Sequence, residues 1–389
     1  MSTLVRNLFR LLASYGFAIV LLAFLFLLTL LGTLEQVDHG LYDAQKKYFE
    51  SFYVIYELYD TVPIPLPGAY LVMALLFVNL VFGAIVRAPK SWTRPGMLIA
   101  HSGILLMLLG GLVTYHLSIR GHMTLYEGES SDEFESYYDW EIAVTEVGAN
   151  TEGRQWVIPQ EHFAGLGPED SRTFHAMALP FDLRIEGFAP NAAVQPASGL
   201  AHGVDGFALI PQAKSREAEQ NIPGAYAVVI EKAKEQAQKG ILWGWSARGG
   251  AIPWVVDIGD SAWSIDLRRQ RWKTPFTIVL DKFIHEQHPG TRMASNYESV
   301  VTQVEGDVRR QVEIRMNEPL RHKGYTLFQA SFGPKDAGPN DRMYSVFEVV
   351  NNPADQWPLY SCIIISFGLS LHFIQRLYGH LRREQRKRS

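Results

Sequence analysis

The chain has 389 residues, of which 47% are hydrophobic and 20% charged, and its formal net charge is −4. This average conceals a partition, because almost all the uninterrupted apolar sequence lies in residues 11–118 and 356–375. The composition therefore argues against a wholly soluble protein.

Four uncharged stretches are long enough to cross a hydrocarbon core, which requires about 20 helical residues. We expect membrane-spanning helices at about 12–34, 66–87, 96–118 and 356–375. A cleaved signal peptide is the alternative for the first stretch, because Arg6 and Arg10 precede it. The stretch is too long for a signal peptide and lacks a small-x-small cleavage site, so we interpret it as an uncleaved helix.

The positions of Lys and Arg predict which side of the membrane each segment occupies, because cationic loops stay in the cytoplasm. Basic residues flank the spans at Arg6 and Arg10, at Arg87, Lys90 and Arg94, and throughout the tail at 376–389. This pattern predicts two cytoplasmic termini and, in a bacterial inner membrane, a periplasmic domain at 120–355. The basic tail directly follows a span, which favours topology and lipid headgroup contact over nucleic-acid binding.

The cysteine content excludes one function. Cys362, the only cysteine, lies inside the fourth span. Without a CxxC pair the chain cannot itself be a thiol oxidoreductase.

Residues 120–355 contain short alternating segments separated by Gly, Pro and Asn, which predicts a mainly-β domain in the form of an antiparallel sandwich or barrel-like sheet. The Lys/Glu/Ala/Gln run at Glu231–Lys239 is predicted to be helical. Strands are expected at His122–Tyr126, Trp140–Val147, Phe181–Phe188, Tyr226–Ile230, Trp263–Leu267, Phe276–Leu280, Val312–Met316, Tyr325–Phe332 and Tyr344–Val350.

The common catalytic and cofactor motifs are missing from the sequence. It contains no phosphate-binding glycine loop, HExxH, nucleophile elbow or CxxCH. His285-Glu286-Gln287-His288 has two histidines three residues apart, but a zinc site needs further ligands, and we interpret this segment as a surface loop.

The histidines in the apolar segments carry the chemical information, because a polar ring in hydrocarbon normally faces the protein interior or a cofactor. His101 lies about six residues into the third span, about 9 Å from its cytoplasmic end. A rotation of 100° per residue places Leu105, Leu108, Leu112, Tyr115 and His116 on its side, with Gly103 and Gly110 nearly opposite. The sequence thus predicts one face for close helix packing and one apolar wall with a histidine towards each end.

Imidazole is a common axial ligand of haem iron, so His101 is the leading haem-ligand candidate, and Tyr115, His116 and His372 are secondary ones. His101 and His116 are about 22 Å apart along the axis, too far to share one ligand. His372 falls at roughly the depth of His101. The alternatives are an interhelical hydrogen bond or, for His116 and His372, a histidine that reaches the interface.

Segments along nearly the whole chain resemble the ResB (CcsB) family, the membrane partner in the type II cytochrome c maturation system. The resemblance is carried by Gly32-Thr33, by Leu75–Leu80 with Arg87, by Ala100-His101-Ser102-Gly103-Ile104, by Leu125–Gly128, by Leu267-Arg268 with Thr274–Phe276, by Phe283–Ser299, and most specifically by Met316–Leu320 with Gly324–Ser331.

The resemblance implies a non-catalytic subunit that works with a ResC (CcsA)-type partner to move haem outward and present it to apocytochrome c. It places the family's transmembrane histidine on His101 as an axial ligand of transiently bound haem b, with the second ligand coming from the partner. Two other classes remain open: a membrane-anchored sensor, which should carry a cytoplasmic output domain, and a transporter accessory subunit without haem. Leu242–Trp245 and Pro253–Asp257 loosely echo a tryptophan-rich haem segment, but we interpret their aromatics as domain core or surface.

Overall fold

A computed structural model describes residues 3–58, 61–87, 95–148, 155–197, 203–234, 236–247, 250–251, 253–287, 294–334 and 341–388. The chain divides into two compact units, one formed by Met1–Ile119 with Asn351–Ser389 and the other by Arg120–Val350. We call them the helical unit and the β unit.

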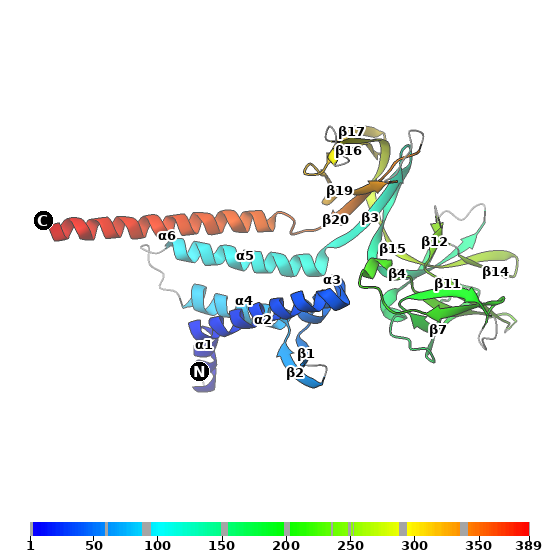
Figure 1. Cartoon of the computed structure of the whole chain (residues 1–389), viewed down its shortest axis with the longest axis horizontal. Coiled ribbons are helices and arrows are strands. Elements are labelled where there is room, and N and C mark those ends of the chain that lie inside the picture. Colours follow the sequence, from blue (N-terminus) through cyan, green and yellow to red (C-terminus); the bar gives the residue numbers. More distant parts are fainter. Residues whose placement is uncertain are drawn as a thin grey trace. The chain divides into compact units, whose positions relative to one another are not determined.

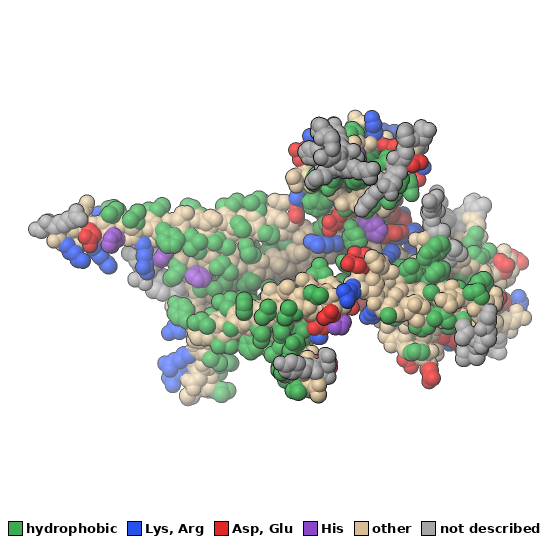
Figure 2. Space-filling model, viewed as in Figure 1, with side chains coloured by type: hydrophobic (Ala, Val, Ile, Leu, Met, Phe, Trp, Pro, Cys, Tyr) green, Lys and Arg blue, Asp and Glu red, His purple; other side chains and the backbone are tan. Residues whose placement is uncertain are grey.

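The helical unit contains the four predicted spans. Within the described part of the chain, four helices are long and apolar enough to cross a membrane: Tyr15–His39, Ala69–Val86, Pro95–Leu117 and Trp357–Lys387. Apolar side chains cover the outside of these helices, and Lys and Arg gather at the far end of the last one (Figure 2). The prediction of four apolar helices is therefore confirmed, whereas their orientation in the membrane stays a prediction. Lys90 and Arg94, two of the charges that predicted it, lie outside the described residues.

The elements of the helical unit follow one another along the chain (Figure 1). They are α1 (Thr3–Leu12), α2 (Tyr15–His39), α3 (Leu41–Ala44), η1 (Gln45–Phe49, a π-helical turn), β1 (Tyr53–Leu58), β2 (Val62–Pro67), α4 (Ala69–Leu80), η2 (Val81–Val86, also π-helical), α5 (Pro95–Leu117) and α6 (Trp357–Arg388).

The first span begins at Tyr15 rather than at residue 12, because the helix is interrupted between α1 and α2. The Ser14 hydroxyl caps α2 by accepting a hydrogen bond from the Phe17 backbone N–H at 3.1 Å. This is the usual way of satisfying the first N–H groups of a helix. The buried Asn79 amide on α4 donates to the carbonyl oxygens of Leu12 (2.6 Å) and Ser14 (3.1 Å) and so holds the break against α4.

Glycines on α5 allow close packing against α6, as the sequence predicted for one face of this helix. A Cβ atom added to Gly96 would lie 2.5 Å from the Gly368 carbonyl oxygen, and one on Gly103 would lie 2.7 Å from Cγ1 of Ile365. Close approach of two backbones through small residues is a common way for membrane helices to associate.

The β unit is built from antiparallel sheets, as predicted. A ten-stranded, nearly closed barrel-like sheet has the order β17-β16-β15-β4-β3-β20-β19-β18, with β14 added to β15 and β5 to β4. A four-stranded sheet has the order β11-β10-β7-β6, and two further pairs are β8-β9 and β12-β13. The strands are β3 (Ile119–Tyr126), β4 (Ser130–Val147), β5 (Gln155–Pro159), β6 (Ser171–Phe174), β7 (Phe181–Ala189), β8 (Ala192–Pro196), β9 (Phe207–Pro211), β10 (Gly224–Glu231), β11 (Ala237–Trp243), β12 (Ser246–Ala247), β13 (Gly250–Ala251), β14 (Trp254–Ile258), β15 (Ser261–Gln287), β16 (Ala294–Glu305), β17 (Val308–Arg315), β18 (Leu320–His322), β19 (Tyr325–Gly333) and β20 (Tyr344–Asn351).

One strand serves both halves of the β unit. The first part of β15 pairs with β14 and with the end of β4, and these strands pack against the four-stranded sheet. The last part of β15 pairs with β16. The core between the two sheets is aromatic and aliphatic, with Phe181, Ile185, Ile265 and Trp263 among its buried members.

Two sequence predictions in this unit are wrong. The run Glu231–Lys239 is not a helix: Glu231 ends β10, residues 232–234 form a turn, and Ala237 begins β11. Pairing between β10 and β11, with Ile230 opposite Ala237, overrides the helical composition of this short segment. The residues from His285 to Gln287 end strand β15 instead of forming a loop, and His288 lies outside the described residues.

Candidate functional site

His101 lies on α5, and one of its ring nitrogens is hydrogen-bonded to the backbone of the same helix. Its Nδ1 is 2.7 Å from the carbonyl oxygen of Met97, one helical turn earlier. A carbonyl only accepts hydrogen bonds, so Nδ1 carries a proton, and in the neutral imidazole the lone pair is then on Nε2. This is the tautomer that a histidine needs to bind a metal through Nε2, with the other nitrogen fixed by a backbone carbonyl.

The structure does not bring His101 and His372 together. Gly96, Gly103 and Gly110 define the face of α5 that packs on α6. At 100° per residue, His101 lies on the other side of the helix. The His372 backbone lies directly against Gly96, on the packed face. His101 and His372, which the sequence placed at a similar depth in the membrane, are thus on different sides of the α5–α6 contact.

A cavity of about 460 Å³ lies between α4, α5 and η1. Its volume is in the range of small-molecule sites. Its walls are mostly apolar, with polar groups at one end, and are formed by Gln45, Phe49, Glu50, Tyr70, Met73, Ala74, Phe77, Val78, Leu108, Leu109, Gly111, Leu112 and Tyr115. Leu108, Leu112 and Tyr115 belong to the stripe predicted on the His101 side of α5, so that part of the stripe faces a cavity.

Of the secondary candidates, Tyr115 lines this cavity, and His116 contacts Tyr70, another lining residue. Nε2 of His116 is 3.0 Å from the hydroxyl of Tyr70 on α4. The Tyr115 ring packs on both neighbours, with centroids 4.9 Å from His116 and 5.8 Å from Tyr70. His116 therefore makes the interhelical hydrogen bond that was its alternative interpretation, and its Nε2 is engaged.

His101 does not line the cavity. The wall on α5 ends at Leu108, seven residues and about 10 Å along the axis from His101. The two ends of the α5 stripe thus lie in different surroundings. Sequence reasoning missed Tyr70 and Phe77, because no pattern in one helix reveals which residues of another will face it.

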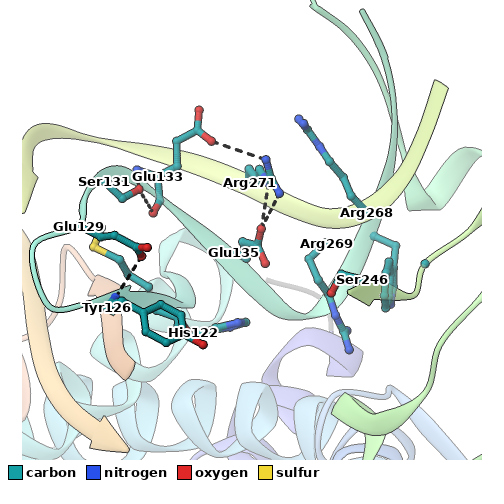
Figure 3. A pocket seen from close by; sticks show the side chains of 14 residues that line it. His122, Tyr126, Glu129, Ser131, Glu133, Glu135, Ser246, Arg268, Arg269 and Arg271 are labelled. Carbon is teal, nitrogen blue, oxygen red and sulfur yellow. Dashed lines mark hydrogen bonds and ion pairs between the residues drawn. The ribbon is translucent and has the colours of Figure 1, made fainter. Parts of the chain in front are cut away.

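The β unit contains a polar cleft of about 610 Å³ (Figure 3). It is lined from β3 by His122, Met123, Thr124 and Tyr126, from β4 and the preceding turn by Glu129, Ser131, Glu133, Glu135 and Trp140, from β15 by Arg268, Arg269 and Arg271, and by Gly244 and Ser246. Sequence analysis did not single out any of these side chains as a site.

Two of the three arginines in the cleft have carboxylate partners. Arg271 pairs with Glu135 at 2.7 Å and lies 3.9 Å from Glu133. Arg268 donates to the buried Glu141 at 2.9 and 3.0 Å through two of its nitrogens. Arg269 takes part in none of the ion pairs formed by the residues that the structure describes. Its surroundings therefore differ from those of its neighbours.

Arg269 is held by main-chain and aromatic groups. Its guanidinium donates to the carbonyl oxygens of Tyr137 and Glu219, both at 2.6 Å, and its Cζ lies 4.0 Å from the centre of the Trp140 ring. Burial lowers the pKa of Arg269 to about 10, against the opposing effect of Glu135 and other acids. The side chain thus remains cationic at neutral pH but is poorly solvated.

His122 contributes an unpartnered nitrogen to the same cleft. Its ring hydrogen-bonds to the Glu135 backbone and packs on Tyr137 at 4.9 Å, but its buried Nδ1 has no partner. Burial lowers the pKa of His122, with the nearby Arg269 acting in the same direction and Glu135 opposing. Because Nε2–H donates to the backbone carbonyl of Glu135, Nδ1 of the neutral ring is a free acceptor. Burial also raises the pKa of Tyr137 to about 12.

Other segments considered from the sequence form no site. Trp243 and Trp245 stack on each other at 5.4 Å, and Trp254 packs against the core, which agrees with their interpretation as domain aromatics. No group of three or more potential metal-ligating side chains occurs in the described ranges.

Comparison with known proteins finds two partial matches. Residues 254–340 match the model of the ResB-like family. A stretch of 70 residues is 43% identical to the cytochrome c biogenesis protein CcsB of Prochlorococcus marinus (strain NATL2A), covering 18% of this chain and 16% of that protein. Over this part of its length the chain is similar to the ResB family, and both matches support a ResB/CcsB family member.

The family match falls within the β unit. It runs from β14 to a point just beyond β19 and includes Arg268, Arg269 and Arg271, whereas His101 lies outside it. The matched stretch spans about a sixth of the length of the curated relative.

Proposed function

We propose that this chain is a haem-handling subunit of cytochrome c biogenesis. In this proposal it works with a ResC/CcsA-type membrane partner to move haem b across the membrane and to present it to apocytochrome c. The family match supports the pathway, and the state of His101 supports haem as the cargo.

The observation that carries the proposal is the hydrogen bond from Nδ1 of His101 to the Met97 carbonyl at 2.7 Å. It leaves Nε2 free to bind iron, and it keeps the ring from rotating away. His101 is half-buried and lies on the side of α5 away from the Gly96 packing face. A second axial ligand from the partner would complete the iron's coordination.

The apolar surroundings suit the porphyrin and exclude water. Leu105 is one turn from His101 on the same face of α5, and it offers an aliphatic surface to a flat ring. When bound, haem would supply the porphyrin whose vinyl groups later form thioether bonds with cysteine, and a histidine ligand such as His101 would shield its iron during transfer. His101 would thus act as a holding group, and no side chain of this chain would act as a nucleophile.

The predicted topology gives the transfer a direction. With basic flanks in the cytoplasm, His101 would lie about 9 Å from the cytoplasmic end of α5. The β unit would then lie on the periplasmic side of a bacterial inner membrane, where apocytochrome c is exported. Tyr115, His116 and His372 have no assigned role in this step. His116 is hydrogen-bonded to Tyr70, and the His372 backbone packs against Gly96 on α5.

Purification of the chain with its partner tests the proposal. The Soret absorbance per protein should fall severalfold in His101→Ala, while His380→Ala, an exposed histidine near the end of the same unit, should retain it. His116→Phe should also retain it, since that ring bonds to Tyr70. Unchanged haem content in His101→Ala, at equal yield of the complex, would refute the role of His101.

A further inference from the structure

The short helix α1 at the start of the helical unit is amphipathic. At 100° per residue, Leu4, Leu8 and Leu11 fall within about 60° of one another around the axis, and all three are exposed. Arg6 and Arg10 lie on the opposite side, one turn apart, and are also exposed. A helix with one basic face and one exposed apolar face typically lies in the plane of a membrane interface.

Contacts with the end of the second span fix the position of α1, which turns away from the line of α2 (Figure 1). The Phe9 ring packs edge-on against Phe82 of η2, with centroids 5.2 Å apart. Nη1 of Arg87, the residue after η2, donates to the Ala13 carbonyl at 3.5 Å. The Asn79 hydrogen bonds hold the same junction from α4. α1 is therefore attached to the end of the second span through both its side chains and its backbone.

Three guanidinium groups surround a hollow at this junction. The cavity has a volume of about 230 Å³ and is lined by Arg6, Phe9, Arg10 and Arg87. Figure 2 shows basic side chains over α1. Arg6 and Arg10 are four residues apart, a spacing at which like charges destabilise a helix. Because Arg87 adds a third positive charge at the same place, the arrangement favours a bound anion.

The cluster lacks an acidic partner among the described residues. The sequence has no Asp or Glu in residues 1–34 or 61–126, which include α1, α4, η2 and α5. The first acid, Glu35, lies about 30 Å along α2 from its start, and it pairs with Lys47 at 2.7 Å. A guanidinium has five N–H donors, and the contact to Ala13 uses one donor of Arg87. Charge and donors are thus left for an anion from outside the chain.

The surroundings of the cluster select an amphiphilic anion. Tyr15 begins the first span and Arg87 directly follows η2, so the hollow lies where two apolar helices end. A phosphodiester offers the oxygen acceptors that guanidinium groups bind in pairs. The cavity is smaller than the roughly 300–1,000 Å³ of sites for whole drug-sized ligands, so it suits a headgroup. Chains attached to that headgroup would lie along the exposed apolar surface of the spans.

We propose that Arg6, Arg10 and Arg87 bind the phosphate of an anionic phospholipid, with α1 resting in the membrane interface on its leucine face. Basic pockets between membrane helices on the cytoplasmic side bind anionic headgroups in other proteins. With the predicted topology, this lipid belongs to the cytoplasmic leaflet. The site goes beyond the proposed function and does not depend on it, because it uses neither haem nor His101.

Native mass spectrometry of the full chain, released from detergent micelles, tests the proposal. The probes are dioleoyl phosphatidylglycerol and dioleoyl phosphatidylcholine, which share acyl chains but differ in net charge. We expect the first phosphatidylglycerol to bind roughly tenfold more tightly than the first phosphatidylcholine, the gain typical of a hydrogen bond to a charged group. A roughly hundredfold excess of glycerol phosphate should displace little of the lipid, because the free headgroup lacks the apolar chains.

Variants of one arginine distinguish a built site from general attraction between cations and lipid. Arg10→Gln should weaken phosphatidylglycerol binding roughly tenfold. Arg10→Lys should weaken it by roughly threefold to tenfold, because lysine keeps the charge but loses the paired N–H contacts. Arg10 is exposed, so neither change should disturb folding. Arg383→Gln removes an exposed charge from the basic tail and is the matched control, which should bind the lipid normally.

Three results would overturn the proposal. Equal binding of the two lipids, or equal affinities in Arg10→Gln and Arg383→Gln, would show that the cluster does not select an anionic headgroup. Unchanged binding in Arg10→Lys would reduce the effect to general charge attraction. Full displacement by glycerol phosphate would identify the ligand as a free phosphate compound instead of a lipid.

Discussion

The close contact between Gly96 on α5 and Gly368 on α6 allows the packing of the helical unit to be tested. In Gly96→Ala the added Cβ would lie 2.5 Å from the Gly368 carbonyl oxygen, 2.5 Å from the His372 backbone nitrogen and 2.9 Å from its Cα. All three are main-chain atoms, so no side-chain rotation relieves the clash. The two helices must separate.

The size of the effect follows from the distance. Ordinary van der Waals contact begins at about 3.4 Å, so the backbones must move apart by roughly 0.9 Å at this point. Overpacking of this kind costs about 1–3 kcal/mol. Alanine also favours the helix by about 1 kcal/mol over glycine. Gly111→Ala on the same helix provides the control for that gain, because its Cβ would meet nothing within 4 Å. We therefore expect Gly96→Ala to be about 1–3 kcal/mol less stable than Gly111→Ala.

Unfolding in mixed micelles with increasing SDS measures this difference. Cys362 is the only cysteine and lies exposed on α6, so an environment-sensitive dye attached there reports the release of α6. Equal free energies of unfolding for the two alanine variants would refute the packing of α5 on α6 through Gly96. A loss in Gly111→Ala as large as that in Gly96→Ala would contradict the assignment of the packed face.

Three further predictions concern buried polar groups. Arg268→Met leaves Glu141, which is 5% exposed, without its cation and should cost about 3–5 kcal/mol in urea unfolding of the β unit. The same change at Arg342, which is 54% exposed, should cost at most about 1 kcal/mol, and similar losses would contradict the difference in burial. Asn79→Leu leaves the carbonyls of Leu12 and Ser14 without their hydrogen-bond donor. The free energy of unfolding in the SDS assay should therefore fall by about 1–3 kcal/mol. An unchanged midpoint would show that the Asn79 hydrogen bonds do not stabilise the junction between α1 and α2. Burial lowers the pKa of His122 below its ordinary 6.5, so protonation favours the unfolded state, and stability should fall more between about pH 7 and pH 5 in the wild-type chain than in His122→Phe. Parallel pH profiles would show that His122 does not titrate differently in the folded state.

The spans could be predicted because hydropathy and length are properties of a single segment. The packed face of α5 was predictable for a similar reason: rotation of 100° per residue places Gly103 and Gly110 together on one face. The break at Ser14 was missed, since its cap depends on one hydroxyl and on Asn79 from another helix.

The sites were less accessible to prediction, because they depend on which elements meet. The spacing of His101 and His116 predicts two different sites, or one functional histidine only, and this stays a prediction. The cavity beside Tyr115 also needs Tyr70 from α4, and nothing in either helix names the other as its neighbour. In the β unit, the polar cleft needs the arginines of β15 beside β3 and β4, and the pattern of one strand does not reveal its neighbours.

The length of β15 has a consequence for how the β unit can change in evolution. This strand of 27 residues is shared by the core against the four-stranded sheet and by the pairing with β16. Side chains alternate between the faces of a strand, so a one-residue insertion near Ile265 would exchange inside for outside along the strand beyond it. The irregularity between Leu280 and Lys282 is a place where an extra residue can be absorbed. We expect insertions and deletions among relatives to collect at such bulges, while the stretch between them keeps a constant length even where its residues vary.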